Sequence, residues 1–136
     1  MPSELRFVLI LSGLAAVAGA ASVFGIYRQD AVRTRTQAEA ITRGNVAAGR
    51  AAIARYSCGA CHRIPGIAGA TGETGPSLNG IALRAEIAGV LVNDPVNLIH
   101  WLRYPQQVLP GNGMPDQGMT EREARDAAAY LYTVTR

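Results

Sequence analysis

The chain contains only two cysteines, and they lie in one short segment together with a histidine. Cys58 and Cys61 are separated by two residues, and His62 follows directly. Two cysteines are too few for a disulfide framework, and a disulfide at this spacing would be geometrically awkward and would leave His62 unexplained. A zinc site usually needs two such pairs, and a thioredoxin-like redox pair needs a βαβ context. The segment therefore indicates a different partner for both thiols and the imidazole.

This pentapeptide has the C-x-x-C-H spacing of an attachment site for c-type haem. The two thiols add across the two vinyl groups of the porphyrin, and a single turn of chain sets them the right distance apart. The next residue then passes under the ring, where its imidazole reaches the iron from one face. We therefore expect one covalently attached haem c, held by Cys58 and Cys61, with His62 as the proximal iron ligand.

A long uncharged run near the N-terminus is the second informative feature. Residues 7–27 read "FVLILSGLAAVAGAASVFGIY", and as a helix they would span about 31 Å, which matches a hydrocarbon core of about 30 Å. A secretory signal has a shorter apolar region, of about 7–15 residues, and an A-x-A-like cleavage site, for which Ala18-Gly19-Ala20 is a candidate. Because the run continues to Tyr27, we expect an uncleaved transmembrane anchor, with a removed signal as the alternative.

The composition divides the chain into three parts. We expect the anchor over residues 1–27, a polar linker over residues 28–43 and a folded domain over residues 44–136. The linker lacks glycine and proline, so it is expected to be either a helical continuation of the span or a solvated tether. The domain contains the cysteine motif, and we expect it to be exported because the attachment of haem to thiols is chemistry of the exported side.

The charges say little about partners. All thirteen basic residues are arginines, and they are spread along the chain instead of forming one stripe, so nucleic-acid binding has no support. Three of them, Arg28, Arg33 and Arg35, follow the apolar run and argue weakly for the opposite orientation. We still expect the folded domain on the exported side, because the expected haem attachment outweighs this charge bias.

The folded domain is predicted to contain helices and loops only. Gly44-Asn45 is a plausible helix start, and Gly49 and Ile53 then lie on one helical face. A second helix should begin at Pro95, capped by Asp94, and stop before Pro105. A third should begin at the capping box formed by residues 120–123 and continue to about Val134.

The glycine- and proline-rich stretch over residues 63–80 is predicted to be a loop. It is longer than compact domains usually permit unless it wraps something functional. The domain also has few large apolar side chains, and domains this small often need a metal or another staple. We therefore expect a domain without a hydrophobic centre of its own, with the haem filling that place.

Residues 44–136 resemble a class I cytochrome c well beyond the attachment motif. "GNVAAGRAAIARYSCGACH" resembles the N-terminal helix of that family, and "GPSLNG" resembles the loop whose proline carbonyl, here that of Pro76, orients the haem-binding histidine. "LIHWLRYPQQVLPGNGMP" resembles the stretch that leads to the methionine ligand, and "AAYLYT" resembles the C-terminal helix, whose aromatic residue, here Tyr130, packs where the first helix presents Gly49. The resemblance implies a small all-α fold wrapped around one covalent haem, preceded here by one transmembrane helix.

Three side chains are candidates for the second axial ligand, namely Met114, Met119 and His100. The resemblance implies Met114, which lies in a turn-rich loop and gives the histidine–methionine pair usual in cytochromes c. Met119 directly precedes the last helix and is expected to be a core or surface residue, and His100 lies in a predicted helix. An iron open on one side is the remaining alternative.

Trp101 stands near the methionine, at a position where the family often has tyrosine. We expect it at the haem, where it packs against the ring or donates its indole N–H to a propionate or to the backbone. The alternative is a core aromatic residue with no tuning role.

The resemblance implies an electron carrier and not an enzyme, with no small-molecule substrate. The implied setting is the periplasmic side of a bacterial inner membrane, where the tethered domain would pass electrons between a quinol-oxidising complex and a terminal oxidase. One alternative is a fixed haem subunit of a larger membrane oxidoreductase, and another is an enzyme or gas sensor with an open iron. The lysines that ring the haem edge of soluble mitochondrial members are absent, which leaves partner recognition open.

Overall fold

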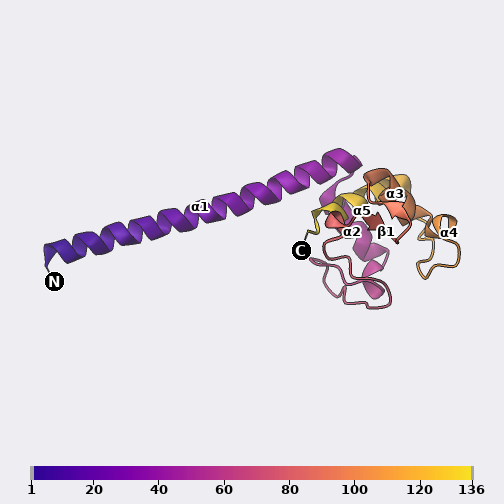
Figure 1. Cartoon of the computed structure of the whole chain (residues 1–136), viewed down its shortest axis with the longest axis horizontal. Helices are drawn as coiled ribbons and strands as arrows, with labels where there is room; N and C mark the ends of the chain where they lie inside the picture. The colour runs from indigo at the N-terminus through magenta and orange to yellow at the C-terminus, as the bar shows by residue number, and fades with distance from the viewer. Residues whose placement is uncertain (1, 136) are drawn as a thin grey trace. The chain divides into compact units, whose positions relative to one another are not determined.

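The computed structural model describes residues 2–135, so Met1 and Arg136, the outer ends of the predicted anchor and domain, lie outside the described residues. The chain is mostly helical, as the sequence predicts (Figure 1). Its elements, with η marking a 3₁₀-helix, are α1 (Ser3–Thr42), α2 (Val46–Arg55), η1 (Cys58–Ala60), η2 (Ile81–Leu83), β1 (Glu86–Ile87), β2 (Leu91–Val92), α3 (Pro95–Arg103), α4 (Pro105–Val108) and α5 (Glu121–Thr133).

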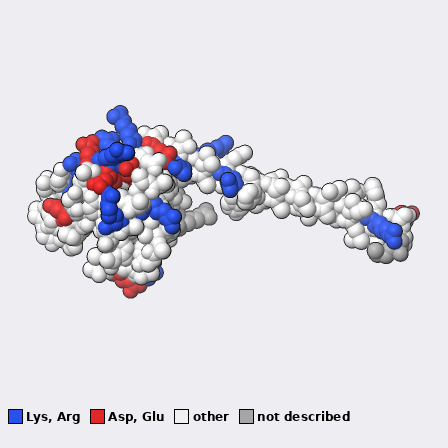
Figure 2. All heavy atoms as spheres, turned by 180° about the vertical axis from the view of Figure 1, so that it is seen from behind, with Lys and Arg blue, Asp and Glu red and all other residues white. Residues whose placement is uncertain are grey.

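Helix α1 runs without a break through both the apolar run and the polar stretch that follows it. It is the one helix of the described residues that is long and apolar enough to cross a membrane. Figure 2 shows a long stretch of this helix free of charged side chains. The chain separates into two compact units, one up to Arg33 and one from Thr34 onwards. The polar stretch is thus a helical continuation, and its last turns belong to the second unit, where Ala38 and Thr42 are buried.

Side chains stabilise the turn between α1 and α2 by accepting hydrogen bonds from its backbone N–H groups. Glu39 Oε1 accepts from the Val46 amide at 3.0 Å, and Asp126 Oδ1 of α5 accepts from the Asn45 amide at 2.7 Å. The helix starts where the sequence predicts, and Asn45 caps it, because its own Oδ1 accepts from the Ala48 amide at 2.9 Å. Helix N-termini leave such N–H groups without partners inside the helix, so these contacts fix where α2 begins.

Helices α2 and α5 cross at very short range, and a glycine makes this possible. Gly49 is buried, and a Cβ atom at this position would collide with the Asp126 carbonyl group and lie 3.0 Å from Tyr130 Cβ. On the α5 side Ala124, Ala127 and Ala128 are fully buried. The predicted packing of Tyr130 where α2 presents its glycine is therefore confirmed.

The expectation that the domain lacks a hydrophobic centre is wrong. A continuous apolar core lies where α5 packs against α2 and α3, and Ile53, Leu98 and Leu131 are its largest fully buried apolar side chains. Much of the remaining core is alanine. Small side chains let helix backbones approach closely, so a core can form from residues that a composition count treats as minor.

Helix α3 follows its predicted signals closely. Asp94 Oδ1 accepts from the Asn97 amide at 2.8 Å, and the helix ends at Arg103, directly before α4. Leu98 and Leu102 point into the core, with exposed fractions of 1% and 7%. The sequence missed α4, both 3₁₀-helices and the antiparallel pair formed by β1 and β2. Each of these elements is four residues or shorter, too short for a hydrophobic period to show.

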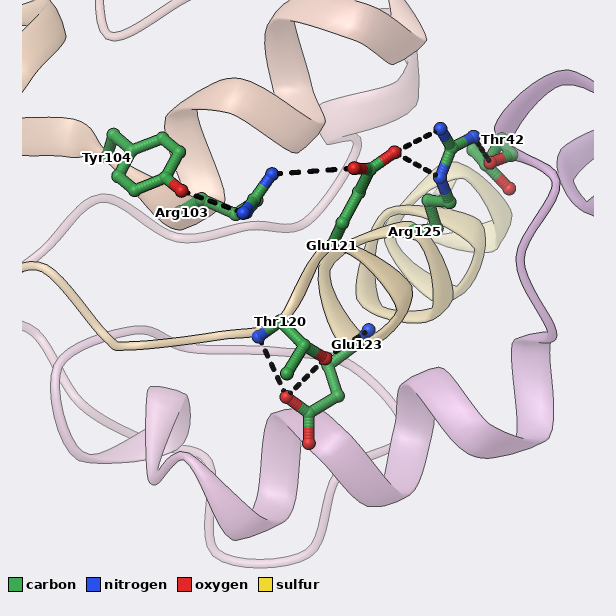
Figure 3. Close-up of polar contacts among 7 residues, drawn as sticks. All are labelled: Thr42, Arg103, Tyr104, Thr120, Glu121, Glu123 and Arg125. Atoms are coloured by element: carbon green, nitrogen blue, oxygen red, sulfur yellow. Dashed lines mark hydrogen bonds and ion pairs between the residues drawn. The ribbon is translucent and has the colours of Figure 1, made fainter.

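Helix α5 begins with the predicted capping box, in which Thr120 and Glu123 bond each other's backbone N–H groups (Figure 3). Glu123 does more than cap. Its carboxylate also accepts from the Tyr56 hydroxyl at 2.7 Å and pairs with Arg55, both at the end of α2. Hydrogen bonds from the Thr120 amide and then from the Tyr56 hydroxyl lower the pKa of Glu123 from 4.5 to about 2. The carboxylate therefore ties the end of α2 to the start of α5.

We predict that Glu123→Gln removes a pH-dependent part of the domain's stability. Because the pKa of this carboxyl falls on folding, its ionised form stabilises the fold above pH 4.5, and this contribution is lost as the pH falls towards about 2. The difference in the free energy of unfolding between wild type and Glu123→Gln should be greatest above pH 4.5 and should shrink below it. Denaturant unfolding followed by circular dichroism across this pH range measures it.

The matched control is Glu86→Gln, since Glu86 is exposed and makes no side-chain hydrogen bond or ion pair within residues 2–135. It should follow the wild type at every pH. A constant offset between wild type and Glu123→Gln at all pH values would contradict the prediction.

Candidate functional site

The cysteine motif lies in a tight turn directly after α2. Ser57 adopts a left-handed conformation with φ 55°, and the chain then enters η1. The amides of Cys61 and His62 both donate to the Cys58 carbonyl oxygen, at 3.3 and 2.9 Å. Both thiols are unbonded to each other, which is the state that haem attachment requires, and burial raises the pKa of the Cys58 thiol while Cys61 is exposed. A single turn of chain thus carries the two thiols and the imidazole.

The imidazole of His62 is held in one orientation by a backbone carbonyl group. His62 Nδ1 lies 2.7 Å from the Pro76 carbonyl oxygen. A carbonyl oxygen only accepts, so Nδ1 carries the proton and donates it, and Nε2 keeps a lone pair. This is the arrangement of a metal-binding histidine, in which the second nitrogen fixes the tautomer and increases the basicity of the ligand nitrogen.

Gly75 contributes a second constraint on the same ring, which sequence reasoning missed. A Cβ atom at this position would lie 2.7 Å from His62 Nδ1 and 3.0 Å from Nε2, closer than real Cβ contacts. The Gly75 amide also donates to the Cys61 carbonyl oxygen at 2.8 Å. The loop backbone therefore lies directly against the imidazole, and only glycine allows this approach. Its position directly before Pro76 was the available signal.

Long-range contacts hold the loop over residues 63–80 in place. The Tyr130 hydroxyl of α5 donates to the Pro65 carbonyl oxygen at 2.7 Å. Arg84 donates to the carbonyl oxygen of Asn79 at 3.1 Å and to that of Ser77, next to Pro76. Sequence reasoning missed Arg84, because nothing local marks an arginine that bonds backbone oxygens several residues earlier. These contacts set the position of the Pro76 carbonyl, and with it the orientation of His62.

Met114 lies in a loop whose backbone is held by two amide side chains. Gln106 Nε2 donates to the Met114 carbonyl oxygen at 2.7 Å, and the Met114 amide donates to Asn112 Oδ1, also at 2.7 Å. Asn112 in turn donates to the carbonyl oxygens of Pro105 and Leu109, at 2.9 and 2.7 Å. Sequence reasoning missed both Gln106 and Asn112. Gln106 lies in α4, and Asn112 bonds the first residue of that helix, so the short helix α4 and these two amides together position Met114.

The other candidates for the distal ligand lie in different surroundings. Met119 is a core residue with an exposed fraction of 5%. His100 is exposed on α3, and its ring is tilted against Tyr104 at a centroid distance of 5.7 Å. Trp101 is half-buried and packs against the core, as does Met114.

Half-buried apolar side chains from separate segments pack against the core. They keep part of their surface uncovered, and they include Cys58 of the motif, Ile67 and Leu78 of the loop that follows it, Trp101 and Met114. Within the described residues, no group of three or more histidine, cysteine or acidic side chains is arranged to hold a bare metal ion. Two thiols, an oriented imidazole and an incompletely buried apolar shell fit a flat apolar group with a central metal better than a zinc site.

Comparison with known proteins agrees with this geometry. Residues 46–135 match the family described as Cytochrome c. The chain is 36% identical over 104 residues to cytochrome c2 of Agrobacterium tumefaciens, a match that covers 65% of this chain and 90% of that protein. It is 37% identical over 84 residues to cytochrome c oxidase subunit 2 of Alkalihalophilus pseudofirmus, and 34% identical over 87 residues to that of Bacillus sp. strain PS3. Each of these two matches covers 61% of this chain but only 24% of the relative. No solved structure matches the chain.

We predict that Gly75→Ala weakens the bond between His62 and the haem iron by displacing the imidazole from the Pro76 carbonyl. Loss of such an orienting contact typically costs about 10–100-fold in affinity for the metal. The two thioether links should keep the haem on the protein, so the effect should appear as a changed ferric absorption spectrum at unchanged haem content. Thr74→Ala is the control, because Thr74 is exposed in the same loop, and its spectrum should match the wild type. Identical ferric spectra in both variants would refute the role given to Gly75.

Proposed function

The chain belongs to the cytochrome c family, which carries covalently attached haem c and transfers electrons, and from this premise we propose that it is a membrane-anchored carrier with a single haem. The proposal depends most on one observation, the His62 Nδ1 contact with the Pro76 carbonyl oxygen at 2.7 Å in a C-x-x-C-H turn. That contact leaves the lone pair of Nε2 free to bind a metal.

In this proposal each residue of the site has a stated role. Cys58 and Cys61 would form the thioether links, His62 would bind the iron through Nε2, and Met114 would supply the second ligand. When bound, the haem supplies a one-electron ferric–ferrous couple. The Pro76 carbonyl oxygen accepts the hydrogen bond from His62 Nδ1–H, which keeps the imidazole basic. The thioether sulfur of Met114 is a weak donor, so it favours the reduced state and raises the potential relative to a second histidine.

The bracing of the Met114 loop supports this ligand assignment. Gln106 and Asn112 bond the backbone on both sides of the Met114 Cα atom, so the side chain starts from a fixed position. Electron transfer needs little change in coordination between the two iron states, and a loop held by side-chain amides suits that requirement. Trp101 is proposed to pack beside this loop, at the edge of the haem.

We propose that residues 1–27 form the membrane anchor, residues 28–43 the connection and residues 44–136 the haem domain. The apolar composition of the first segment and the length of α1 support this division. The haem domain would lie on the periplasmic side of a bacterial inner membrane, where thiols are joined to haem. An anchor replaces diffusion in solution by a high effective concentration near other membrane proteins.

The proposed partners are a quinol-oxidising complex as donor and a terminal oxidase as acceptor. The similarity to two cytochrome c oxidase subunits supports an acceptor of this kind. The same similarity favours a second candidate function, a fixed haem subunit within a larger membrane oxidoreductase. Both functions use the same haem site and differ only in how long the chain stays bound to its partner.

Extraction of the full-length chain from its own membranes distinguishes the two functions. After solubilisation in a mild detergent, a carrier should migrate alone in size-exclusion chromatography. A fixed subunit should co-purify in a constant ratio with other membrane proteins. Constant stoichiometry through two further purification steps would contradict the carrier.

We predict that Met114→Ala lowers the reduction potential and opens the ferrous iron to carbon monoxide at neutral pH. The shift should exceed about 60 mV, which corresponds to a tenfold change in the equilibrium of a one-electron couple. Spectroelectrochemical titration and carbon monoxide difference spectra measure the two effects. Met119→Leu is the control, since Met119 is a buried core residue, and it should change neither reading. An unchanged potential in Met114→Ala would assign the distal position to another residue.

A further inference from the structure

Helix α3 presents an apolar and basic face that the haem site does not use. Its inward residues Leu98 and Leu102 are buried in the core. Val96, Ile99 and Arg103 lie at helical spacing on another face, where Val96 has an exposed fraction of 75%. Apolar residues at spacing of three and four mark the side of a helix that packs against something. On this face the structure provides no packing partner among residues 2–135 that covers Val96.

This face forms one wall of a groove within the second compact unit. The opposite walls come from the last turn of α1 with the residue after it, and from the first turns of α5. Residues that line the groove include Ile41, Arg43, Val96, Ile99, Arg103 and Arg125. None of Cys58, Cys61, His62, Pro76, Trp101 or Met114 is among the lining residues, so the groove is separate from the haem site.

One carboxylate lies between two of the walls (Figure 3). Glu121 pairs closely with Arg125 on α5 and lies 3.7 Å from Arg103 on α3. Arg125 also donates to the Thr42 carbonyl oxygen at the end of α1, at 3.4 Å. The groove therefore does not depend on a mobile loop, and a partner would meet a surface that is already shaped.

The charges of the groove are unbalanced. Three lining arginines, Arg43, Arg103 and Arg125, face a single lining carboxylate, that of Glu121. Glu121 forms its close ion pair with Arg125, and its distance to Arg103 is long for an ion pair. Arg43 makes no ion pair or side-chain hydrogen bond within the described part of the chain. The groove thus combines apolar side chains with positive charge that the chain itself does not neutralise.

We propose that this groove is a docking site for an acidic, amphipathic segment of a partner protein. Such a segment would place apolar side chains against Val96 and Ile41 and carboxylates beside Arg43 and Arg103, as helices do in apolar grooves with charged rims. An anionic lipid surface would match the charge and also cover apolar side chains, but a flat membrane fits a groove between three helices less well than an inserted segment does. A second copy of this surface would bring arginines against arginines. The proposal concerns a site apart from the haem, and it rests on the proposed assignment of Met114 as the distal ligand, because the alternative His100 also lines the groove.

The test uses the full-length, haem-loaded chain in detergent and a pair of synthetic peptides. One peptide is an amphipathic helix of leucine and glutamate, and its twin has lysine in place of every glutamate. Fluorescence anisotropy at low ionic strength gives the dissociation constant for each. The glutamate peptide should bind, and Arg43→Glu and Val96→Ser should each weaken its binding by about fivefold or more.

Two matched controls belong to the same measurement. Arg122→Glu changes an exposed arginine of α5 that does not line the groove, and Leu83→Ser removes an apolar side chain whose exposed fraction, 75%, equals that of Val96. Both should stay within about twofold of the wild type. The absorption spectrum of the haem should be the same in all four variants. A failure of this proposal would then leave the haem assignment intact.

Three results would overturn the proposal. The first is equal binding of the lysine peptide, and the second is an equal loss in the control variants. The third is an effect of Arg43→Glu confined to co-flotation with phosphatidylglycerol vesicles, or to self-association in analytical ultracentrifugation, with unchanged affinity for the glutamate peptide. These last outcomes would assign the groove to lipid or to a second copy of the chain.

Discussion

Gly49 lets the backbone of α2 lie against the backbone of α5, and the position of the haem site follows from this contact. A side chain at Gly49 would collide with the Asp126 carbonyl group. Gly44, directly before α2, is under the same restriction, because a Cβ atom there would collide with the Arg125 carbonyl group. Two glycines on one side and a row of alanines on the other thus set the distance between the helices. With so few large apolar side chains, the domain needs this short distance to bury enough surface.

Helix α5 also holds the two parts of the site, the turn with the cysteines and the loop that leads to Pro76. The turn with the two cysteines begins where α2 ends, and Glu123 of α5 holds that end through Tyr56. One helical turn beyond the crossing, the Tyr130 hydroxyl holds the carbonyl oxygen of Pro65 in the loop that leads to Pro76. The motif and the loop that orients its histidine are therefore both fastened to α5. This explains how residues without regular structure hold an imidazole in one tautomer.

Features that depend only on neighbouring residues in the chain could be predicted from the sequence. Asp94 and Thr120 each cap a helix as expected, because a cap needs only a side chain and an amide three residues away, and α2 starts next to Asn45 as expected. The turn of the motif is local in the same sense. Family resemblance added Pro76, whose carbonyl indeed lies at hydrogen-bonding distance from His62.

The features that escaped prediction depend on the path of the chain in space. Gln106 and Asn112 bond the backbone of the Met114 loop, and nothing in their local sequence marks them. The strands β1 and β2 are two residues each, and their pairing needs the turn between them. The apolar core was underestimated because alanine contributes little area per residue yet allows helices to come close. In the sequence, the pair Gly75-Pro76 indicates only a loop. In the structure, Gly75 matters because its backbone lies against the His62 imidazole.

The use of arginine alone for positive charge bears on how this chain meets its partners. A guanidinium group is planar and binds carboxylates through two parallel hydrogen bonds, whereas an ammonium group acts as a strongly hydrated point charge. Mobile, hydrated charges suit brief encounters in solution, and a rigid fork suits contacts of defined geometry. Arg125 donates to Glu121 through two nitrogens of its guanidinium group, and Arg103 of α3 lies 3.7 Å from the same carboxylate. A groove lined in this way, away from the haem, gives a partner a means to hold the domain without covering the site where electrons enter and leave. The two proposed functions then differ in a measurable physical quantity, the lifetime of the contact at this groove, and the haem chemistry is the same in both.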